Sequence, residues 1–358
     1  MRKPLLAALS ILLLSATCSA AERIVLVAGG GTSTAAAPAK EAKLVAPFGI
    51  DFDQSGNAFL VELSGGRVLR IDSKGMLVTI AGAEEKGNGG DGGPAKNAAF
   101  NGMHSLAIGP DGVVYLADTW NNRIRTYDPR SGKIEAFAGT GEKGYSGDGG
   151  PAIKAKFGGI YSVAFDAAGR NIVLADLDNR RVRKIELASG IVTTVAGNGE
   201  KGVPADAAEA AKSPLVDPRA ACFDSKGNVY VLERSGNALR FVTPDGKIRT
   251  VAGTGKVGAT GDGGDATNAT LNGPKHLCAD REDNIIFADT ENHLIRKYLH
   301  KESKLVRIAG SGKKGTGGID GPPLAVELNQ PHGVYLHPSG ELYIVDSSNN
   351  RVLKIVKE

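Results

Sequence analysis

The chain lacks the short motifs by which many enzyme classes are recognised in a sequence. It has no Gly-x-Ser-x-Gly nucleophile motif, no paired-cysteine metal motif and no phosphate-binding loop. Its Gly-Asp-Gly-Gly runs are not dinucleotide-binding fingerprints, because no helix pattern follows a strand in the required order. The sequence therefore gives no support to a serine hydrolase, a paired-cysteine metal protein or a nucleotide-binding enzyme.

The chain also lacks a strong charge of either sign. It has 43 Lys and Arg against 39 Asp and Glu, and 41 against 39 without Arg2 and Lys3. Nucleic-acid binding draws most of its affinity from a basic face that releases counterions. We therefore exclude nucleic acid as the expected partner.

Aromatic residues and cysteines are scarce, whereas glycine is abundant. Only 5% of the 358 residues are aromatic, three are cysteines and 49 are glycines. Length alone would suggest two domains, but this composition is typical of one large all-β domain rich in tight turns. We expect a single domain over residues 22–358.

No apolar run is long enough to span a membrane. The longest, Leu5 to Leu14, follows Arg2 and Lys3 and precedes Ser19-Ala20-Ala21, which is the pattern of an export signal. We expect residues 1–21 to be a signal peptide and the protein to be secreted or periplasmic. A lipoprotein signal at Cys18 is the alternative, although Ser15 stands where such signals normally have Leu.

A carboxylate recurs at the end of a short apolar strand pattern about every 57 residues. The six copies are Glu62, Asp118, Asp176, Glu233, Asp289 and Asp346. A period near 50 residues is typical of a propeller blade or solenoid unit, which buries its apolar face only by stacking on its neighbours. Each unit contains four strand patterns separated by turn residues, and we expect burial to fall from the first strand to the fourth.

The two ends of the chain indicate a closed ring. Every fourth strand ends in Ala-Gly, with the alanines at Ala28, Ala81, Ala138, Ala196, Ala252 and Ala309. Residues 23–29 form a lone fourth strand, while the last unit, 333–357, has only the first three. Joining the termini removes the exposed sheet edges. The prediction is an all-β, six-bladed β-propeller of four-stranded blades, closed by the N-terminal strand.

The repeat units resemble a known family. Residues 331–334, 342–346 and 349–352 read Pro-His-Gly-Val, Leu-Tyr-Ile-Val-Asp and Asn-Asn-Arg-Val, and 114–125 follow the same pattern. These units resemble NHL repeats over about residues 24–358. The resemblance implies a binding module for protein or RNA, or, in the branch of peptidylglycine amidating lyases, an enzyme.

Ligand-binding candidates lie at the start of each first strand. Around the expected central opening these positions are Phe48, His104, Tyr161, Arg219, Lys275 and His332. Polar residues beside a propeller channel favour ligand binding without a cofactor. The main prediction is therefore a scaffold that binds ligands through the face carrying its long loops.

The alternative is a zinc-dependent lyase or hydrolase. The segments around His104 and His332 resemble two of the three zinc-ligand motifs of amidating lyases, which implies these histidines as metal ligands. The third position holds Arg219, while Arg234 resembles a catalytic arginine of those lyases; His276 is one residue out of register. Catalysis would then use Tyr161, Arg219 and Arg234.

Five lysines follow the Ala-Gly strand ends in the long loops: Lys86, Lys143, Lys201, Lys256 and Lys313. One hypothesis is a basic ring that attracts an anionic carbohydrate or acidic peptide. The other is a set of solvated lysines balanced by Glu85, Glu142 and Glu200. Trp120 is a further ligand candidate that stacks on a sugar or peptide, or else packs on its own hairpin. We expect a monomer whose partner is a protein, a peptide or an anionic carbohydrate.

Three further patterns favour structural roles. The Gly-Asp-Gly-Gly loops at 90–93, 147–150 and 261–264 offer one carboxylate each, which favours turns over calcium sites. Cys222 and Cys278 occupy equivalent positions in adjacent units, which favours free thiols over a disulfide. Hairpin spacing predicts that Glu62, Asp118, Asp176 and Asp346 pair with Arg67, Arg123, Arg181 and Arg351, and that Glu233 and Asp289 lack this partner. Either unpaired carboxylate is then a candidate base.

Overall fold

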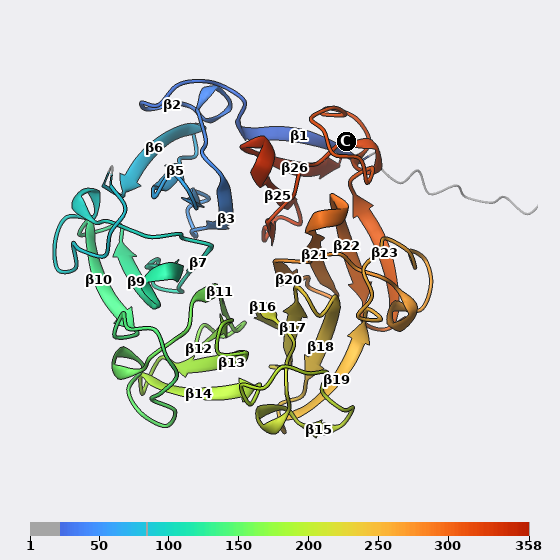
Figure 1. The fold of residues 1–358 in the computed structure, drawn as a ribbon. Helices are drawn as coiled ribbons and strands as arrows, with labels where there is room; N and C mark the ends of the chain where they lie inside the picture. The colour runs from blue at the N-terminus through green and yellow to red at the C-terminus, as the bar shows by residue number, and fades with distance from the viewer. Residues whose placement is uncertain (1–21, 84, 358) are drawn as a thin grey trace, which may run out of the picture.

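In the computed structural model, residues 22–83 and 85–357 are described, and they form a ring of six sheets (Figure 1). The predicted signal peptide, with Cys18, lies outside the described residues. Blade one comprises β3 (Pro47–Phe52), β4 (Ala58–Glu62), β5 (Val68–Ile71) and β6 (Met76–Ala81). Blade two comprises β7 (Ser105–Ile108), β8 (Val114–Asp118), β9 (Arg123–Asp128) and β10 (Lys133–Ala138).

The next three blades repeat the same order. Blade three comprises β11 (Ile160–Phe165), β12 (Asn171–Asp176), β13 (Arg181–Glu186) and β14 (Ile191–Ala196). Blade four comprises β16 (Pro218–Phe223), β17 (Val229–Glu233), β18 (Ala238–Val242) and β19 (Lys247–Ala252). Blade five comprises β20 (Leu277–Ala279), β21 (Ile285–Asp289), β22 (Leu294–Leu299) and β23 (Lys304–Ala309).

Blade six joins the two ends of the chain. It comprises β24 (Gly333–Leu336), β25 (Leu342–Asp346), β26 (Arg351–Lys357) and β1 (Glu22–Gly29). Strand β1 pairs antiparallel with β26 from Glu22 opposite Lys357 to Gly29 opposite Arg351, and the two strands lie side by side in Figure 1. The predicted six-bladed propeller and its closure by the N-terminal strand are confirmed.

The Ala-Gly strand endings have a steric cause. The alanine of each copy is completely buried, and the register of the fourth strand shifts just before it. The glycine that follows has a positive φ, 84° at Gly29, and a Cβ there would overlap the carbonyl oxygen of Asn350. Only glycine fits such a close approach to the neighbouring turn.

Short 3-10 helices complete the connections. Those in the long loops are η1 (Ala39–Glu41), η2 (Ala95–Asn97), η4 (Ala152–Lys154), η5 (Ala210–Lys212), η6 (Ala266–Asn268) and η8 (Pro323–Ala325). Those in the turns from second to third strand are η3 (Thr119–Asn121), η7 (Thr290–Asn292) and η9 (Ser347–Asn349). Two loops add an outer strand to the following blade, β2 (Ala37–Pro38) on β6 and β15 (Ala208–Glu209) on β19. The long loops therefore also protect the outer sheet edges.

The core lies between neighbouring blades. One cluster joins Phe59 and Val61 of blade one to Leu106 and Leu116 of blade two, and clusters of the same kind join the other neighbours. Burial is highest in the second strands, such as β4 and β8, where every residue is buried. The expectation that burial falls from the first strand is wrong, because the first strands border the central channel. Within the described ranges, no helix is long and apolar enough to cross a membrane.

Candidate functional site

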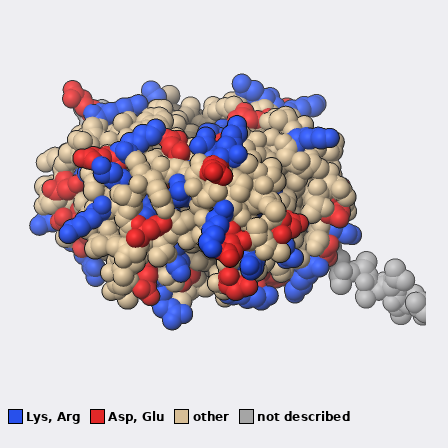
Figure 2. Space-filling view, turned by 60° about the horizontal axis from the view of Figure 1, so that its bottom comes forward, with Lys and Arg blue, Asp and Glu red and all other residues tan. Residues whose placement is uncertain are grey.

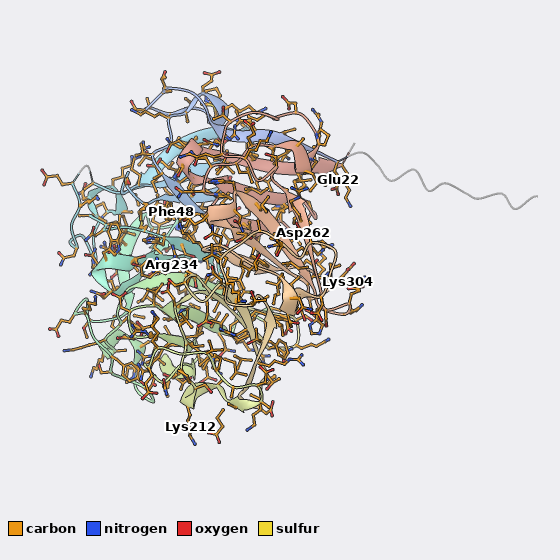
Figure 3. The ribbon with its side chains drawn as sticks, turned by 45° about the vertical axis from the view of Figure 1, so that its right-hand side comes forward. Glu22, Phe48, Lys212, Arg234, Asp262 and Lys304 are labelled. Carbon is orange, nitrogen blue, oxygen red and sulfur yellow. The ribbon has the colours of Figure 1, made fainter. Side chains whose placement is uncertain are left out.

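The six predicted positions meet at one end of the channel, on the face that carries the long loops. The Phe48 ring stacks on His332 with centroids 3.7 Å apart and meets His104 edge-on at 5.1 Å. The rings of His104 and Tyr161 lie 4.5 Å apart, and the Arg219 guanidinium lies 4.5 Å from the Tyr161 centroid. Figure 3 shows Phe48 and Arg234 in the inner part of the ring, whereas Lys212 and Lys304 lie at its periphery.

Arg219 is the central cation of this mouth cluster, which consists of Phe48, His104, Tyr161, Arg219 and His332. Its Nη1 donates to the Tyr161 carbonyl oxygen at 3.3 Å, and its Nη2 lies 3.3 Å from His332 Nε2. Its Nε, which is buried, has no hydrogen-bond partner among the described atoms. Arg219 is only 3% exposed, yet none of the ion pairs formed in the described part of the chain includes it.

Burial and neighbouring positive charges lower the pKa values of the basic groups in this cluster. Burial, followed by the charge of Arg234, lowers the pKa of Arg219 to about 9, so it stays charged at pH 7. Burial and then the charge of Arg219 hold the pKa of both His104 and His332 well below the usual value. Both imidazoles are therefore neutral at pH 7. The mouth is a positive site in which the neighbouring histidines do not add charge.

The side chains do not fit the zinc site of the catalytic alternative. His332 Nε2 faces the Arg219 guanidinium, and His104 Nδ1 lies 2.8 Å from the carbonyl oxygen of Gly102 and 3.1 Å from Thr119 Oγ1. Zinc needs three protein ligands for catalysis, and a guanidinium repels it. Among residues 22–83 and 85–357, no group of three His, Cys, Asp or Glu side chains is arranged to hold a metal ion.

Two ion pairs form the rim above the mouth cluster. Arg234 Nε donates to Asp217 Oδ2 at 2.8 Å, and Lys275 Nζ lies 2.8 Å from Glu291 Oε1. Trp120 covers Gly102, where any side chain would overlap the indole, and it remains 45% exposed. Its ring meets His104 edge-on at 5.6 Å. Trp120 thus packs on the preceding long loop and still presents a ring surface to solvent beside the mouth.

The five loop lysines are all exposed, but they do not act alike. Lys143 pairs with Asp178 at 2.7 Å, whereas Glu142 pairs with Lys156 at 2.6 Å. Lys86 Nζ lies 5.8 Å from the Trp120 ring centroid. Figure 2 shows Lys and Arg interspersed with Asp and Glu over the face that it presents. The loop carboxylate next to Lys143 therefore does not pair with it, and a basic ring stays a prediction.

The repeated carboxylates are ion-paired, with two differences from the prediction. Glu62, Asp118 and Asp346 contact Arg67, Arg123 and Arg351 at 2.7, 3.3 and 2.7 Å, as predicted. Asp176 instead pairs with Arg183 at 3.8 Å, because Arg181 donates to carbonyl oxygens of Asn179 and Asn198.

Glu233 and Asp289 lie opposite Ala238 and Leu294, so they lack the cross-strand arginine as predicted, but they are not unpaired. Arg240 and Arg296, two residues further along the third strand than the expected partner, contact them at 2.5 and 3.3 Å. Their side chains return to the carboxylate because alternate strand residues share a face. Neither carboxylate is free to act as the predicted base.

The Gly-Asp-Gly-Gly loops have a structural role that the sequence did not reveal. Asp91, Asp148 and Asp262 contact the buried third-strand arginines Arg125, Arg183 and Arg296 at 2.6, 2.6 and 2.8 Å. Each arginine also donates to loop carbonyl oxygens, as Arg296 does to Thr260 and Thr270. The motif therefore fixes a long loop to the following blade. The sequence signal is an arginine at the third position of the third strand.

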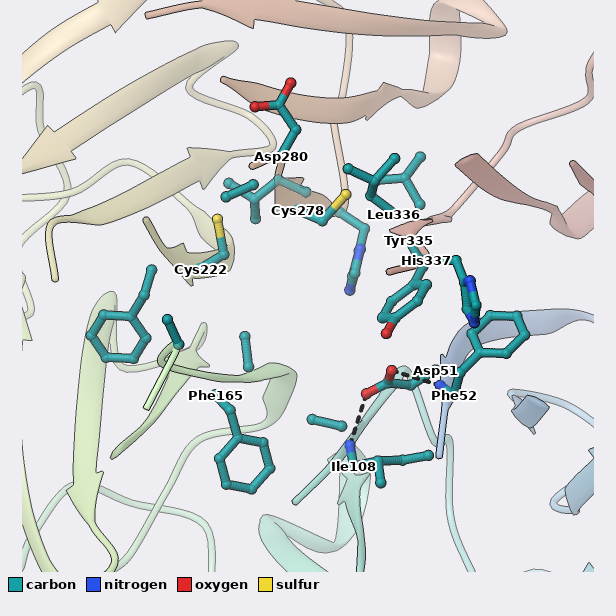
Figure 4. Close-up of a pocket in the computed structure, with 18 of the residues that line it drawn as sticks. Asp51, Phe52, Ile108, Phe165, Cys222, Cys278, Asp280, Tyr335, Leu336 and His337 are labelled. Carbon is teal, nitrogen blue, oxygen red and sulfur yellow. Dashed lines mark hydrogen bonds between the residues drawn. The ribbon is translucent and has the colours of Figure 1, made fainter. Parts of the chain in front are cut away.

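A cavity of about 680 Å³, which we did not predict from the sequence, occupies the other end of the channel (Figure 4). Its walls come from all six first strands and include Asp51, His276 and Tyr335 as well as Cys222 and Cys278. Both cysteines are free, as predicted. Cys222 lies opposite Tyr230 and Cys278 opposite Ile286, which confirms their equivalent positions.

The protein is thus a six-bladed β-propeller with a charged channel mouth. Residues 328–355 match the family model of the NHL repeat, and the resemblance to NHL-repeat propellers is confirmed. The chain is 25% identical over 345 residues to human NHL repeat-containing protein 2, covering 87% of this chain and 46% of that protein. It is 24% identical over 270 residues to SUPPRESSOR OF QUENCHING 1, a chloroplastic protein of Arabidopsis thaliana, covering 73% of this chain and 25% of that protein. The chain thus spans less than half the length of either relative.

Solved structures share the fold at low sequence identity. A protein of unknown function from Bacteroides thetaiotaomicron has a TM-score of 0.70 and 16% identity, covering 94% of this chain and 76% of that chain. An auxiliary nutrient binding protein from the same organism has a TM-score of 0.67 and 14% identity, with the same coverage. A virginiamycin B lyase from Staphylococcus aureus in complex with quinupristin has a TM-score of 0.56 and 11% identity, covering 94% and 100%. At these identities the likeness establishes the fold alone.

Proposed function

We propose that the protein is an exported binding propeller that holds an anionic group of a carbohydrate, peptide or protein ligand at the mouth cluster. The observation that carries this proposal is Arg219, a buried guanidinium that forms no ion pair in the described part of the chain, while Asp217, whose charge acts on it, is paired with Arg234. Burying a charge that is not paired costs several kcal/mol, so such a group is rarely kept without a function. An anionic ligand would supply the missing counter-charge.

The surroundings of Arg219 support an anion over a cation. Arg234 and Lys275 stand at the rim, each paired with one carboxylate, and the buried histidines are neutral, so Arg219 leaves a net positive charge at the mouth. Trp120 and Tyr161 offer ring surfaces on which a sugar or a peptide side chain could stack. The nutrient-binding description of one structural neighbour is consistent with a binding role for this fold. A carboxylate that reaches Arg219 would replace His332 as the partner of Nη2.

Calorimetric titration with matched ligands tests this proposal. The probes are trigalacturonate and triglutamate, each compared with its neutral methyl ester. We expect the acids to bind at least about tenfold more tightly than the esters, since a charge-assisted contact is worth roughly 1.5–3 kcal/mol. Arg219→Met should abolish this preference, whereas Arg219→Lys should keep part of it.

Several outcomes would contradict the proposal. Equal binding of acid and ester is one, and unchanged acid binding by Arg219→Met is another. Failure of both acids to bind at millimolar concentration would count against it as well. The lyase or hydrolase alternative, which uses Tyr161, Arg219 and Arg234, stays a prediction from the sequence.

A further inference from the structure

Six equivalent residues, which form one level of the ring, line the cavity at the far end of the channel. Six residues, one from each first strand, lie opposite the second-strand residue that precedes the repeated carboxylate by three positions. They are Asp51, Ala107, Ala164, Cys222, Cys278 and Tyr335, and all six line the cavity. Small side chains in blades two and three leave the space open, and its walls extend to turn residues Ser225, Arg281 and Pro338. The cavity therefore lies toward the face opposite the long loops.

Asp51 is the polar centre of this level. Its Oδ2 accepts the Ile108 N–H at 2.8 Å and its Oδ1 the Phe52 N–H at 2.7 Å, and Tyr335 lines the same part of the cavity. No Lys or Arg of the described ranges forms an ion pair with Asp51. Figure 4 shows the carboxylate and the Tyr335 hydroxyl directed toward each other inside the channel.

The other ionisable groups of the wall leave the cavity negative. Asp280 is neutralised by Lys297 at 2.5 Å, while Asp224 accepts hydrogen bonds from Lys226 and Asn228 of its own turn. The single wall guanidinium, Arg281, donates to the Pro338 carbonyl oxygen. Burial keeps His276 neutral by lowering its pKa to about 4, and its buried Nδ1 has no partner among described atoms. His337 contacts Ser339.

Aromatic rings stand beside Asp51. The Phe52 centroid lies 5.3 Å from that of Tyr335 and 4.7 Å from that of His337, and Phe165 and Phe223 contribute to the opposite wall. Aromatic faces next to a carboxylate are the usual surroundings of an organic ammonium group. The volume is within the range of small-molecule sites.

We propose that this cavity is a second binding site, distinct from the mouth cluster, for a small organic ammonium ion with an apolar body. Asp51 is the counter-ion, the rings of Phe52, Tyr335 and His337 surround the ammonium group, and the aliphatic wall receives the apolar body. The site does not depend on the anion site, because its charged group, its opening and its ligand class all differ.

The test compares 2-phenylethylammonium with 2-phenylethanol, its neutral counterpart, by calorimetric titration of the whole protein. The ammonium ion should bind at least about tenfold more tightly, and Asp51→Asn should remove the preference. Asp111→Asn is the matched control: it removes an exposed carboxylate on the same face, outside the cavity, and should leave binding unchanged.

Equal affinity for the two probes in the unmodified protein would overturn the proposal without any variant. A preference that survives in Asp51→Asn, with a thermal midpoint that shows the variant to be folded, would overturn it too. Neither result bears on the acid and ester titrations at Arg219.

Discussion

At the scale of single residues, the channel contains two charges that form no ion pair in the described ranges, the buried Arg219 at the long-loop end and the partly buried Asp51 at the other. Most other buried charges in the described ranges have partners, as Arg240 has in Glu233. We expect a charge that binds a ligand to lack a partner in the ligand-free protein, and a charge that stabilises the fold to have one. It can be measured as a difference in stability.

Arg219→Met should therefore stabilise the ligand-free protein, by about 1–3 kcal/mol, because it removes a buried charge that has no counter-ion. Arg240→Met is the control, since it leaves Glu233 buried and unpaired and should cost about 3–5 kcal/mol. Urea unfolding at pH 7 measures both. A large loss of stability in Arg219→Met would mean that the guanidinium is structural.

Asp51 should make stability depend on pH in a defined direction. Burial raises its pKa from 3.8 to about 6, so the folded state holds this proton more tightly than the unfolded chain does. The stabilisation is complete below about pH 4 and is lost as the pH rises through 6. Asp51→Asn should thus be more stable than the unmodified protein by about 3 kcal/mol at pH 8 and no more stable at pH 3.5.

Other carboxylates with raised pKa values do not affect the difference in stability between Asp51→Asn and the unmodified protein. Asp176 and Asp289 also have pKa values raised to about 6, but they are present in both proteins and cancel in the difference. Urea unfolding at several pH values gives the measurement. A difference in unfolding free energy that stays constant between pH 4 and pH 8 would refute the raised pKa of Asp51.

At the scale of elements, the long loops are held to the following blade by aspartate and buried arginine. Hairpin spacing alone correctly predicted three of the carboxylate pairs, because those arginines lie directly across the turn. It did not reveal the partners of Glu233 and Asp289, since the arginines that pair with them lie two residues further along the third strand. Hairpin spacing predicts which backbone positions lie opposite each other, but a long arginine side chain can contact a carboxylate that is not directly opposite.

Asp262→Ala should loosen its loop while leaving the blade folded. Arg296 would keep its contact with Asp289 at 3.3 Å and its bonds to the Thr260 and Thr270 carbonyl oxygens, but it would lose the carboxylate of Asp262 at 2.8 Å. Because Asp262 is partly exposed, we expect a cost of about 1–2 kcal/mol and faster amide exchange over residues 258–268. Asp206→Ala is the control. It lies in a loop that lacks the Gly-Asp-Gly-Gly motif, and it should change amide exchange in its own loop less. Unchanged exchange over 258–268 would contradict the anchoring role of Asp262.

At the scale of the whole molecule, closure of the ring depends on β1. A chain that starts at Gly30 leaves the edge of β26 exposed and removes the buried Ile24 and Ala28. It should unfold at a lower temperature and aggregate, compared with a chain that starts at Glu22. Ile24→Ala is the milder version and should cost about 2–5 kcal/mol. Calorimetry and light scattering check both, and equal midpoints would contradict closure as a source of stability.

The sequence predicted the ring, its closure and the meeting of residues at the channel mouth, because all three follow from a repeat read at equivalent positions. It did not predict that Arg219 is unpaired, which depends on where distant carboxylates point. The cavity was also missed, although Cys222 and Cys278 mark the level of the ring that forms it. Asp51 and Tyr335 occupy equivalent positions in the neighbouring blades one and six. The sequence places them on one level of the ring, but only the packing of their side chains shows that this level contains a cavity.

The proposal that Arg219 binds an anion can be tested by unfolding the unmodified protein and Arg219→Met, each in citrate and in chloride at equal ionic strength. A bound anion stabilises the folded state by mass action, and general salt effects are common to both proteins. We predict that Arg219→Met is the more stable protein in chloride and that citrate narrows or reverses the difference in unfolding free energy. An identical response of the two proteins to citrate would contradict an anion site at Arg219.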